Sequence, residues 1–553
     1  MGAAAPPADL AAVFAAAPAY SDAALSPDGK HLALVSPNDA GDRLAIFEIG
    51  SAAPPVVATL NESEVANVAW AKNDRVVVAV SRRKLDDVNR FHRLADRALA
   101  ISVDGKNTAT LLSNTELQAT SSSTQEIADL NPTDPNYIFM PAYFYRAQLR
   151  ADFMPGDYEY NLYRVNLTNG GAARACVGTR DTAQWIMDCT GNLVARIETE
   201  RGKGDRILLP DGNDYREIAR INDRPDNKGQ IAGLTEDGLS LAVIAQREGN
   251  RKGLYRFDLA TGKWGETLYY DPLVDVVGGF EDENSQRVAG VVYLDGGLSK
   301  WKYFSPEREA VTSRLQRGFP GRNILFVSWS ADRANALFEV SDGMAPTVLY
   351  HIDTRTNRVA SVAGKQQQID RLPVPTREEL TYPGSDNAAL KGMLVLPPGR
   401  EPKALPLIVM TGESYGGPYW IRDFLSQKGY AAFYAGRRAH KELGDLSGMG
   451  ELGTWMTEFQ EDIRIGVKHL VDKGIVDPKR VCVFGQGMDG YAALSTGAFS
   501  ADTISCTISI HGYSELKPLV EDQTYARSFG QSLFSSELVR NSGNYSVEDL
   551  ERF

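Results

Sequence analysis

A glycine-rich corner between an apolar run and a helical pattern is the feature of this sequence that could carry chemistry. Residues 481–484 predict a buried strand, residues 485–490 a tight turn, and the alanine-rich residues that follow the start of a helix. A strand, a turn and a helix in this order form the nucleophile elbow of serine hydrolases, whose pattern is G-x-S-x-G. Here Gly487 occupies the position of the serine, and Asp489 that of the last glycine. The corner therefore has the setting of a hydrolase site without its nucleophile.

A second match to the same pattern lies upstream, at residues 412–416. It makes Ser414 a rival nucleophile, and the chain offers these bases and orienting carboxylates for it: His440, His511, Asp445, Asp462 and Asp477. However, this match follows the first long buried strand, where hydrolases place the loop that binds the oxyanion. Its glycines also have a structural use, because they let the backbone turn with positive φ. We therefore prefer the downstream corner and keep Ser414 as the weaker candidate.

The histidines and glycines do not indicate a metal or a cofactor. No two histidines have the H-x-x-x-H spacing of a metal site, and His511, alone after a predicted strand, is typical of a structural residue. Residues 485–490 also match G-x-G-x-x-G, but no acidic residue ends a second strand about 20 residues later, as dinucleotide binding requires. The corner also lacks the G-K-[ST] ending of a phosphate loop. The sequence therefore predicts no metal and no cofactor.

Length and charge limit the classes to which the chain can belong. Its 553 residues are too many for one ordinary core, so two or more domains are expected. A net charge of −12 argues against a nucleic-acid surface, which needs concentrated lysine and arginine. No run of about 18 apolar residues predicts a transmembrane segment.

The compartment is suggested by the N-terminus and the cysteines. The alanine-rich start has no basic region before its apolar stretch, so it does not predict an intact signal peptide. A mature terminus left after export and a cytoplasmic start both fit, and we slightly favour a periplasmic or secreted protein. Four cysteines are too few for a disulfide scaffold. Cys176 and Cys189 could bridge in an oxidising compartment or be two separate core residues, and Cys482 and Cys506 are expected to be core residues of buried strands.

Seven similar phrases divide the first two-thirds of the chain. Each is a polar turn followed by a strand of alternating apolar residues, as in ALSPDGKHLALV from Ala24. The turns centre near residues 28, 73, 134, 190, 237, 283 and 332, and a spacing of roughly 45–60 residues suits one four-stranded blade per repeat. A second phrase, such as LYRFDLATG from Leu254, predicts the third strand of a blade. The repeats predict a β-propeller of about seven four-stranded blades that serves as a docking surface or lid and carries no chemistry itself.

The last third of the chain alternates strands with helices. Continuous apolar runs, such as residues 405–410, predict buried strands, and Trp455, Ile463 and Leu470 lie at the spacing of a long amphipathic helix. This alternation predicts a mostly parallel sheet, with Gly485 at the carboxyl edge where ligands bind. The expected divisions are an N-terminal extension at 1–20, the propeller at 21–364, a polar, proline-bearing linker at 365–376 and an α/β unit at 377–553.

These features resemble the prolyl oligopeptidase family of serine peptidases, in particular its dipeptidyl-peptidase and acylaminoacyl-peptidase branches. The family joins a propeller to an α/β-hydrolase domain. Residues 415–418 are similar to its Y-G-G-P oxyanion loop, residues 428–438 to the strand before N-Y-R-G-S, and residues 477–494 to D-P-x-R, a strand and G-x-S-x-G-G-Y-A-A. The resemblance implies that the propeller screens the site so that only small peptides reach it. It also implies that Tyr415 and the backbone N–H of Met488 hold the oxyanion.

The chain departs from the family's pattern at several positions. Gly487, which matches the nucleophile, has no Oγ, so no acyl-enzyme can form there. Asp489 adds a fixed negative charge, which disfavours a developing oxyanion, and residues 437–439 have lost the glycine and serine of R-G-S. In the family, the aspartate and histidine of the triad lie on later strand ends, and this sequence stops at Phe553 before them. We therefore expect an α/β-hydrolase domain without its last strands and without an intact catalytic residue.

Three hypotheses for function follow. The first is a catalytically inactive, prolyl-oligopeptidase-like protein that binds peptides or partner proteins. The second is a truncated or mutated form of an active serine oligopeptidase or exopeptidase that hydrolyses short peptides. The third is a subunit of an assembly, either with a partner chain that completes the sheet or as a homo-oligomer, because an unpaired apolar edge strand otherwise invites aggregation.

Overall fold

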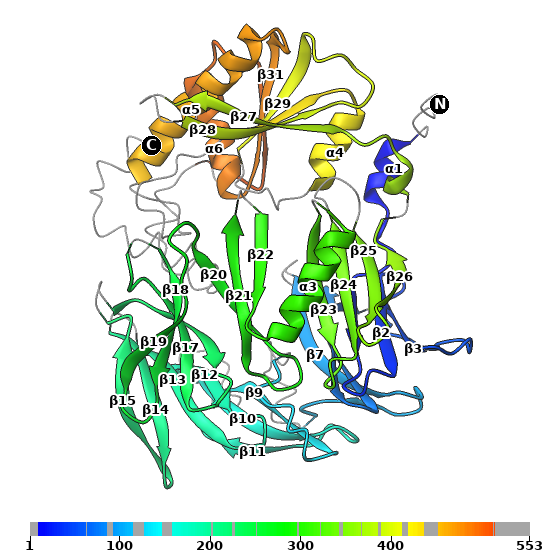
Figure 1. Ribbon diagram of the computed structural model, residues 1–553, viewed down its shortest axis with the longest axis vertical. Coiled ribbons are helices and arrows are strands. Elements are labelled where there is room, and N and C mark those ends of the chain that lie inside the picture. Colours follow the sequence, from blue (N-terminus) through cyan, green and yellow to red (C-terminus); the bar gives the residue numbers. More distant parts are fainter. Residues whose placement is uncertain are drawn as a thin grey trace. The chain divides into compact units, whose positions relative to one another are not determined.

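The computed structural model describes residues 9–61, 63–85, 92–113, 126–145, 158–200, 203–223, 227–249, 251–295, 298–320, 322–341, 347–366, 368–384, 389–411, 419–435, 452–512 and 514 (Figure 1). The chain divides into two compact units. The larger unit comprises residues 16–342 and 346–370, and the smaller unit comprises residues 1–15, 343–345 and 371–553.

The larger unit is a β-propeller whose seven blades are successive antiparallel sheets. Blade 1 contains β1 (Asp22–Leu25), β2 (His31–Ser36), β3 (Arg43–Glu48) and β4 (Val56–Thr59). Blade 2 contains β5 (Glu64–Lys72), β6 (Arg75–Leu85), β7 (His92–Ser102) and β8 (Thr108–Thr110). Blade 3 contains β9 (Tyr137–Tyr145), β10 (Tyr158–Asn166) and β11 (Ala172–Cys176). Blade 4 contains β12 (Thr182–Met187), β13 (Leu193–Glu200), β14 (Gly204–Asp211) and β15 (Asp214–Ile221).

The remaining blades follow the same order along the chain. Blade 5 contains β16 (Gln230–Leu234), β17 (Ser240–Ala245), β18 (Gly253–Asp258) and β19 (Lys263–Tyr269). Blade 6 contains β20 (Val276–Glu281), β21 (Val288–Asp295) and β22 (Leu298–Tyr303). Blade 7 contains β23 (Asn323–Trp329), β24 (Asn335–Ser341), β25 (Val348–Asp353) and β26 (Arg358–Gly364). The predicted turns lie where a first strand passes into a second, as near residue 28 between β1 and β2. The prediction of a seven-bladed propeller is confirmed.

Two blades depart from the four-strand pattern. In blade 3, the described residues before β9 contribute only an isolated bridge, between Asp129 and Phe139. In blade 6, helix α3 (Pro306–Gly318) follows the third strand, and its buried Val311 and Leu315 pack into the core of blade 7. The helix starts here because Ser305 caps it and a proline follows directly. A helix therefore follows β22 where a fourth strand is expected.

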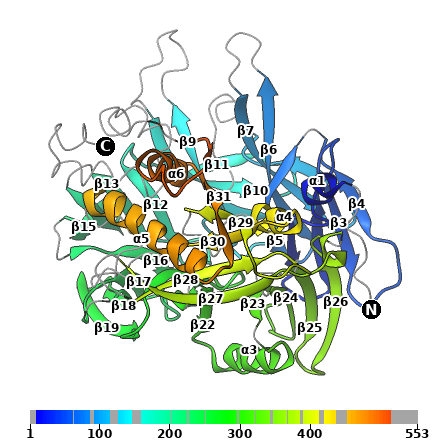
Figure 2. The same cartoon turned by 90° about the horizontal axis from the view of Figure 1, so that it is seen from above.

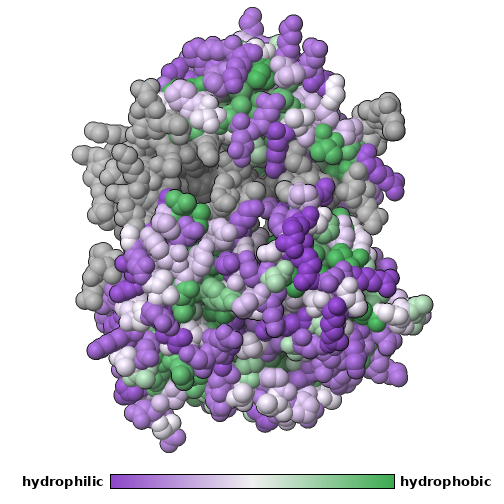
Figure 3. Space-filling view, viewed as in Figure 1, coloured by the Kyte–Doolittle hydropathy of each residue, from purple (hydrophilic) through white to green (hydrophobic). Residues whose placement is uncertain are grey.

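Every blade is built from consecutive strands, so no blade combines strands from both ends of the propeller. Side-chain contacts join blade 7 to blade 1 instead. Ser328 Oγ of β23 accepts a hydrogen bond from the backbone N–H of Leu25, 3.0 Å away. The hydroxyl of Tyr20 donates to Glu339 Oε1 at 2.9 Å, and the ammonium of Lys365 lies 3.3 Å from the same oxygen. The propeller surface in view in Figure 3 is mainly hydrophilic, with apolar residues in small separate patches.

The smaller unit is built on a six-stranded sheet in the order β27-β28-β30-β29-β31-β32. Its strands are β27 (Thr376–Pro383), β28 (Ala389–Leu396), β29 (Leu405–Met410), β30 (Ala431–Tyr434), β31 (Val476–Gln486) and β32 (Cys506–Ile510), and a short turn, η2 (Ile369–Arg371), comes before it in the chain. The last four strands are parallel, whereas β27 and β28 are antiparallel. This is the mostly parallel sheet that the sequence predicted.

Helices cover both faces of this sheet (Figures 1 and 2). Successive residues of a strand point to opposite faces, so Leu407 and Val409 of β29 pack with α5 (Leu452–Asp472) and α6 (Met488–Phe499). Ile408 and Met410 pack on the other face with α4 (Tyr419–Gln427). The strands are therefore apolar on both faces, and α6 leads directly from β31 into the helix layer.

The N-terminal helix α1 (Leu10–Ala15) belongs to the smaller unit. Its Leu10 and Phe14 are buried, and the ring of Phe14 lies edge-on to Phe424 of α4 with 5.7 Å between centroids. The sequence predicted only an extension at residues 1–20 and did not predict this contact.

Candidate functional site

The strand–turn–helix corner predicted around residue 487 is present. Strand β31 ends at Gln486, α6 begins at Met488, and Gly487 between them has φ 61° and ψ −124°. A residue with a side chain is strained in this conformation, whereas glycine adopts it readily. The backbone thus makes the sharp turn that presents the elbow residue at the carboxyl edge of the sheet.

Hydrogen bonds hold the elbow between the ends of the two neighbouring strands. The backbone N–H of Gly487 donates to the carbonyl oxygen of Ile510, at the end of β32, over 2.9 Å. On the other side, the hydroxyl of Thr411, directly after β29, donates to the carbonyl oxygen of Asp489 at 2.7 Å. Three parallel strand ends therefore fix the position of the turn.

The glycines of the corner differ in what a side chain would meet. A Cβ atom on Gly485 would overlap the carbonyl oxygen of Asp489, and one on Gly490 would lie 2.7 Å from the Cα of Gly512. These two positions need glycine because backbone approaches backbone there. At Gly487, in contrast, no atom of the described chain lies within 4 Å of where Cβ would be. Among the described residues, none fills the space that a reactive side chain at residue 487 would occupy.

Asp489 lies in the first turn of α6 and is half-buried. The crowded positions of the corner are Gly485 and Gly490 on either side of it. A carboxylate in the first turn of a helix is stabilised by the helix dipole. Asp489 thus has a structural use besides the electrostatic effect on an oxyanion that the sequence suggested.

Several predicted site residues lie outside the described part of the chain. These are Ser414, Tyr415, His440, Asp445 and the turn at 437–439. Met488 is the first residue of α6, and the N–H groups of a helix's first turn have no acceptor within the helix. The pairing of Tyr415 with Met488 as oxyanion donors stays a prediction.

The described orienting candidates do not meet at the elbow. Asp477 is the second residue of β31, about ten residues or roughly 30 Å from Gly487 along the strand. Its carboxylate accepts from the N–H of Lys479 and the guanidinium of Arg480, which hold its pKa below the ordinary value. Asp462 is fully buried on α5 beside Gly384, which follows β27, and β27 lies four strands or about 19 Å from β31.

Among the described histidines, His511 is the one that lies at the elbow. It directly follows Ile510, whose carbonyl accepts from the N–H of Gly487, and its side chain is exposed. Neither Asp462 nor Asp477 accompanies it. Among the described residues, no group of three or more metal-binding side chains is found, and no helix is long and apolar enough to cross a membrane.

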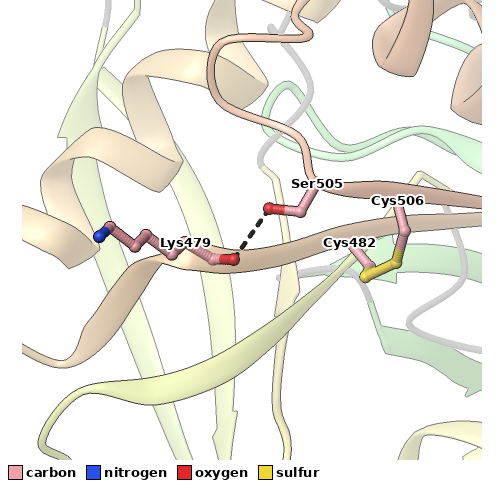
Figure 4. Close-up of a disulfide and its surroundings, with 4 residues drawn as sticks. All are labelled: Lys479, Cys482, Ser505 and Cys506. Atoms are coloured by element: carbon pink, nitrogen blue, oxygen red, sulfur yellow. Dashed lines mark hydrogen bonds between the residues drawn. A yellow bond between two sulfur atoms is a disulfide. The ribbon is translucent and has the colours of Figure 1, made fainter.

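A disulfide joins Cys482 to Cys506 in the strand that leads to the elbow (Figure 4). The two residues are register partners on β31 and β32, with Cα atoms 4.6 Å apart, and the hydroxyl of Ser505 beside them donates to the carbonyl of Lys479 at 3.0 Å. The expectation that Cys482 and Cys506 are separate core residues is therefore wrong. The sequence already placed these two cysteines in consecutive strands of a mostly parallel sheet, and this placement could have predicted the disulfide.

The other two cysteines are unpaired. Cys176 is half-buried on β11, and Cys189, which follows β12, is buried. The bridge between them that the sequence allowed is not formed.

The fold and the elbow define a class of protein, in which a β-propeller is combined with an α/β-hydrolase domain. Comparisons with known proteins agree with this class. The chain is 24% identical over 432 residues to dipeptidyl aminopeptidase BIII of Pseudoxanthomonas mexicana, covering 74% of this chain and 60% of that protein. The chain thus spans less than two-thirds of the length of this relative. No family model matches the chain.

Solved structures share the architecture at lower identity. A puromycin-hydrolyzing peptidase from Mycobacterium tuberculosis has a TM-score of 0.64 and 13% identity, over 98% of this chain and 85% of its own. Prolyl oligopeptidase B from Galerina marginata, bound to a 25mer macrocyclization substrate, has a TM-score of 0.62 and 12% identity, over 92% of this chain and 75% of its own. Together, the sequence match and the shared fold make the chain similar to peptidases of the prolyl oligopeptidase family.

Proposed function

We propose that the chain is a catalytically silent, prolyl-oligopeptidase-like protein that binds peptides or a peptide segment of a partner protein. The observation that carries the proposal is the residue at the elbow. Covalent catalysis by this family's arrangement needs a side-chain oxygen that attacks the scissile carbonyl. Gly487 has the backbone conformation of the elbow residue and no side chain, so this position forms no acyl-enzyme.

The elbow keeps features that bind without reacting. The first N–H groups of α6 can donate to a neutral carbonyl oxygen of a peptide. The carboxylate of Asp489 opposes the negative charge of a tetrahedral intermediate, but it opposes a neutral carbonyl much less. The corner therefore suits a bound amide better than a transition state.

Peptides are the ligand class that the relatives support. The Galerina marginata protein was solved with a 25mer substrate, and the Pseudoxanthomonas mexicana relative is named a dipeptidyl aminopeptidase. These properties belong to those proteins, and we extend only the class of ligand to this chain.

A second candidate is a mutated form of an active serine peptidase. The space beyond Gly487 favours it, because a serine side chain would meet no described atom there. Restoring a hydroxyl at residue 487 separates the two candidates. A peptidase that lost only its nucleophile would regain reactivity, whereas a catalytically silent protein would not.

We also propose that the protein works in an oxidising compartment such as a periplasm or the extracellular space. The disulfide between Cys482 and Cys506 supports this proposal, because disulfides persist mainly in such compartments.

The test of the main proposal measures binding and cleavage of the same peptides. Short peptides are titrated into the chain by calorimetry and then recovered by chromatography, and we expect saturable binding with the peptides uncut. Gly487→Leu fills the open space at the elbow and should weaken binding by about tenfold or more, which corresponds to about 1.4 kcal/mol.

The matched control is Gly50→Leu, which replaces another glycine at positive φ with no atom within 4 Å of its Cβ position, in the propeller. It should leave the affinity unchanged. Cleaved peptides would contradict the silent site, and equal affinities of the two variants would contradict binding at the elbow.

A further inference from the structure

A loop of blade 6 makes contacts far from its own blade. Residues 282–287 connect β20 to β21, at the end of the propeller where first strands pass into second strands, which we call the turn end. The carboxylate of Asp282 accepts from the N–H groups of Asn284 and Ser285 at 3.0 and 2.8 Å, and the N–H of Asp282 donates to the carbonyl of Arg287 at 2.8 Å. The loop is thus closed on itself by its own hydrogen bonds.

Gln286 at the tip of this loop bonds to blade 3. Its Oε1 accepts from the backbone N–H of Leu130 at 2.7 Å, and its Nε2 lies 3.4 and 3.5 Å from the carbonyl oxygens of Ile127 and Ala128. Blades 3 and 6 are not neighbours, because blades 4 and 5 separate them on one side and blades 7, 1 and 2 on the other. A direct hydrogen bond between them must therefore cross the central channel.

The loop also bonds to the blades on both sides. In blade 4, the guanidinium of Arg287 donates to the carbonyl of Asp188 at 2.9 Å, and the thiol of Cys189 lies 3.6 Å from the carbonyl oxygen of Asn284. In blade 7, the carbonyl of Trp329 accepts from the side-chain amide of Asn284 at 3.0 Å. The loop is thus bonded to blades 3, 4 and 7 as well as to its own blade.

The base of the loop is fixed by charge. Asp282 pairs with Arg308 of α3, which is buried, and lies 3.3 Å from the guanidinium of Arg333 in blade 7. Burial alone would raise the pKa of Asp282, but the two arginines and the backbone N–H groups hold it below the ordinary value. The carboxylate therefore stays ionised and keeps the loop tied to its neighbours.

We propose that residues 282–287 are a plug that closes the turn end of the propeller channel to peptides. A peptide in the channel then enters and leaves at the opposite end. This inference concerns the propeller alone and does not depend on the chemistry at Gly487.

Cys189 is a built-in reporter of the plug. Its thiol is buried under Asn284, and burial followed by the charge of Asp129 raises its pKa to about 11. Alkylation at mildly alkaline pH measures how often the thiol becomes accessible. Cys176 on the outer strand of blade 3 is the internal reference, because it is free and bonds to no residue of the loop.

The variants remove the bond that crosses the channel. Gln286→Ala deletes it, and Gln286→Gly deletes it while suiting the positive φ of 50° at this position. The matched control is Gln316→Ala on α3, whose side chain bonds only locally, to the carbonyls of Phe319 and Arg322. Each protein is treated with iodoacetamide and, separately, with a maleimide-terminated polyethylene glycol, and the labelled cysteines are mapped by mass spectrometry.

We expect both Gln286 variants to speed labelling of Cys189 by about tenfold or more, with the bulky reagent as well as the small one. Cys176 in every protein and Cys189 in Gln316→Ala should react at the wild-type rate. Unchanged labelling of Cys189 in the Gln286 variants would overturn the proposal. So would labelling by the small reagent alone, or a parallel rise at Cys176, since neither shows a local opening wide enough for a peptide.

Discussion

Three glycines within the elbow serve different physical purposes. Gly485 and Gly490 leave room for backbone that passes at contact distance, whereas Gly487 adopts a conformation that strains other residues. A serine at residue 487 would be held in that strain by the surrounding fold, and glycine removes both the strain and the reactive atom. The elbow backbone is therefore present without the reactive atom that the G-x-S-x-G pattern supplies.

Glu281, at the end of β20, allows a prediction for stability against pH. Neighbouring protein atoms desolvate its carboxylate although part of the residue is exposed, and this desolvation, opposed in part by Arg287 and reinforced by Glu126, raises its pKa from 4.5 to about 7. Between these values the unfolded chain has released a proton that the folded chain still holds, so rising pH destabilises the fold through this group. Glu281→Gln should therefore gain thermal stability relative to wild type as the pH rises from about 5 to about 8.

Melting temperatures by scanning calorimetry across that interval measure the effect. Glu236→Gln, at an exposed turn of the propeller, is the control for loss of one negative charge. If the melting temperatures of Glu281→Gln and wild type differed by the same amount at every pH, that result would contradict the raised pKa of Glu281.

Elements of regular pattern could be predicted from the sequence, and contacts between distant elements could not. The strand at 405–410 was predicted at its observed bounds because a fully buried strand is a continuous apolar run. The next buried strand was predicted only at residues 481–484, yet β31 begins at Val476 and includes Pro478. A proline near the start of a strand costs no ladder bond when its N–H side is unpaired, so propensity alone misplaced this boundary.

The disulfide between β31 and β32 makes a prediction about these two elements. Denatured, unreduced protein should show two of its four cysteines as free thiols, Cys176 and Cys189. Because the bridge closes a segment of 24 residues, its loss in Cys482→Ser/Cys506→Ser should lower the free energy of unfolding by about 3 kcal/mol.

Thiol titration and urea unfolding measure these two quantities. Cys176→Ser, which removes an unpaired cysteine, is the control and should leave one titratable thiol. Four free thiols in the unreduced wild-type protein would contradict the bridge.

At the scale of the whole molecule, the repeated phrases predicted the number of blades, and their polar turn residues predicted where the turns lie. Seven turns recur because each blade needs the same polar corner before its second strand. The bond from Gln286 to Leu130 joins residues 156 positions apart, and no local preference of either residue encodes it. The candidate site shows the same limit: the corner at 485–490 was visible as a motif, whereas its clamping by Thr411 and Ile510 depends on the order of the strands.

The central expectation is that this chain, although similar to peptidases, forms no covalent intermediate at its elbow. The most direct measurement is the intact mass of the chain after treatment with a fluorophosphonate, followed by peptide mapping, with Gly487→Ser and Gly487→Ala treated in parallel. We expect no adduct on the wild type or on Gly487→Ala, and at most slow labelling of Gly487→Ser, because neither Asp462 nor Asp477 lies beside His511 to orient it as a base, and an unassisted hydroxyl is a poor nucleophile. An adduct on the wild-type chain, at Ser414 or elsewhere, would contradict the claim, and rapid labelling of Gly487→Ser would identify a mutated active peptidase instead.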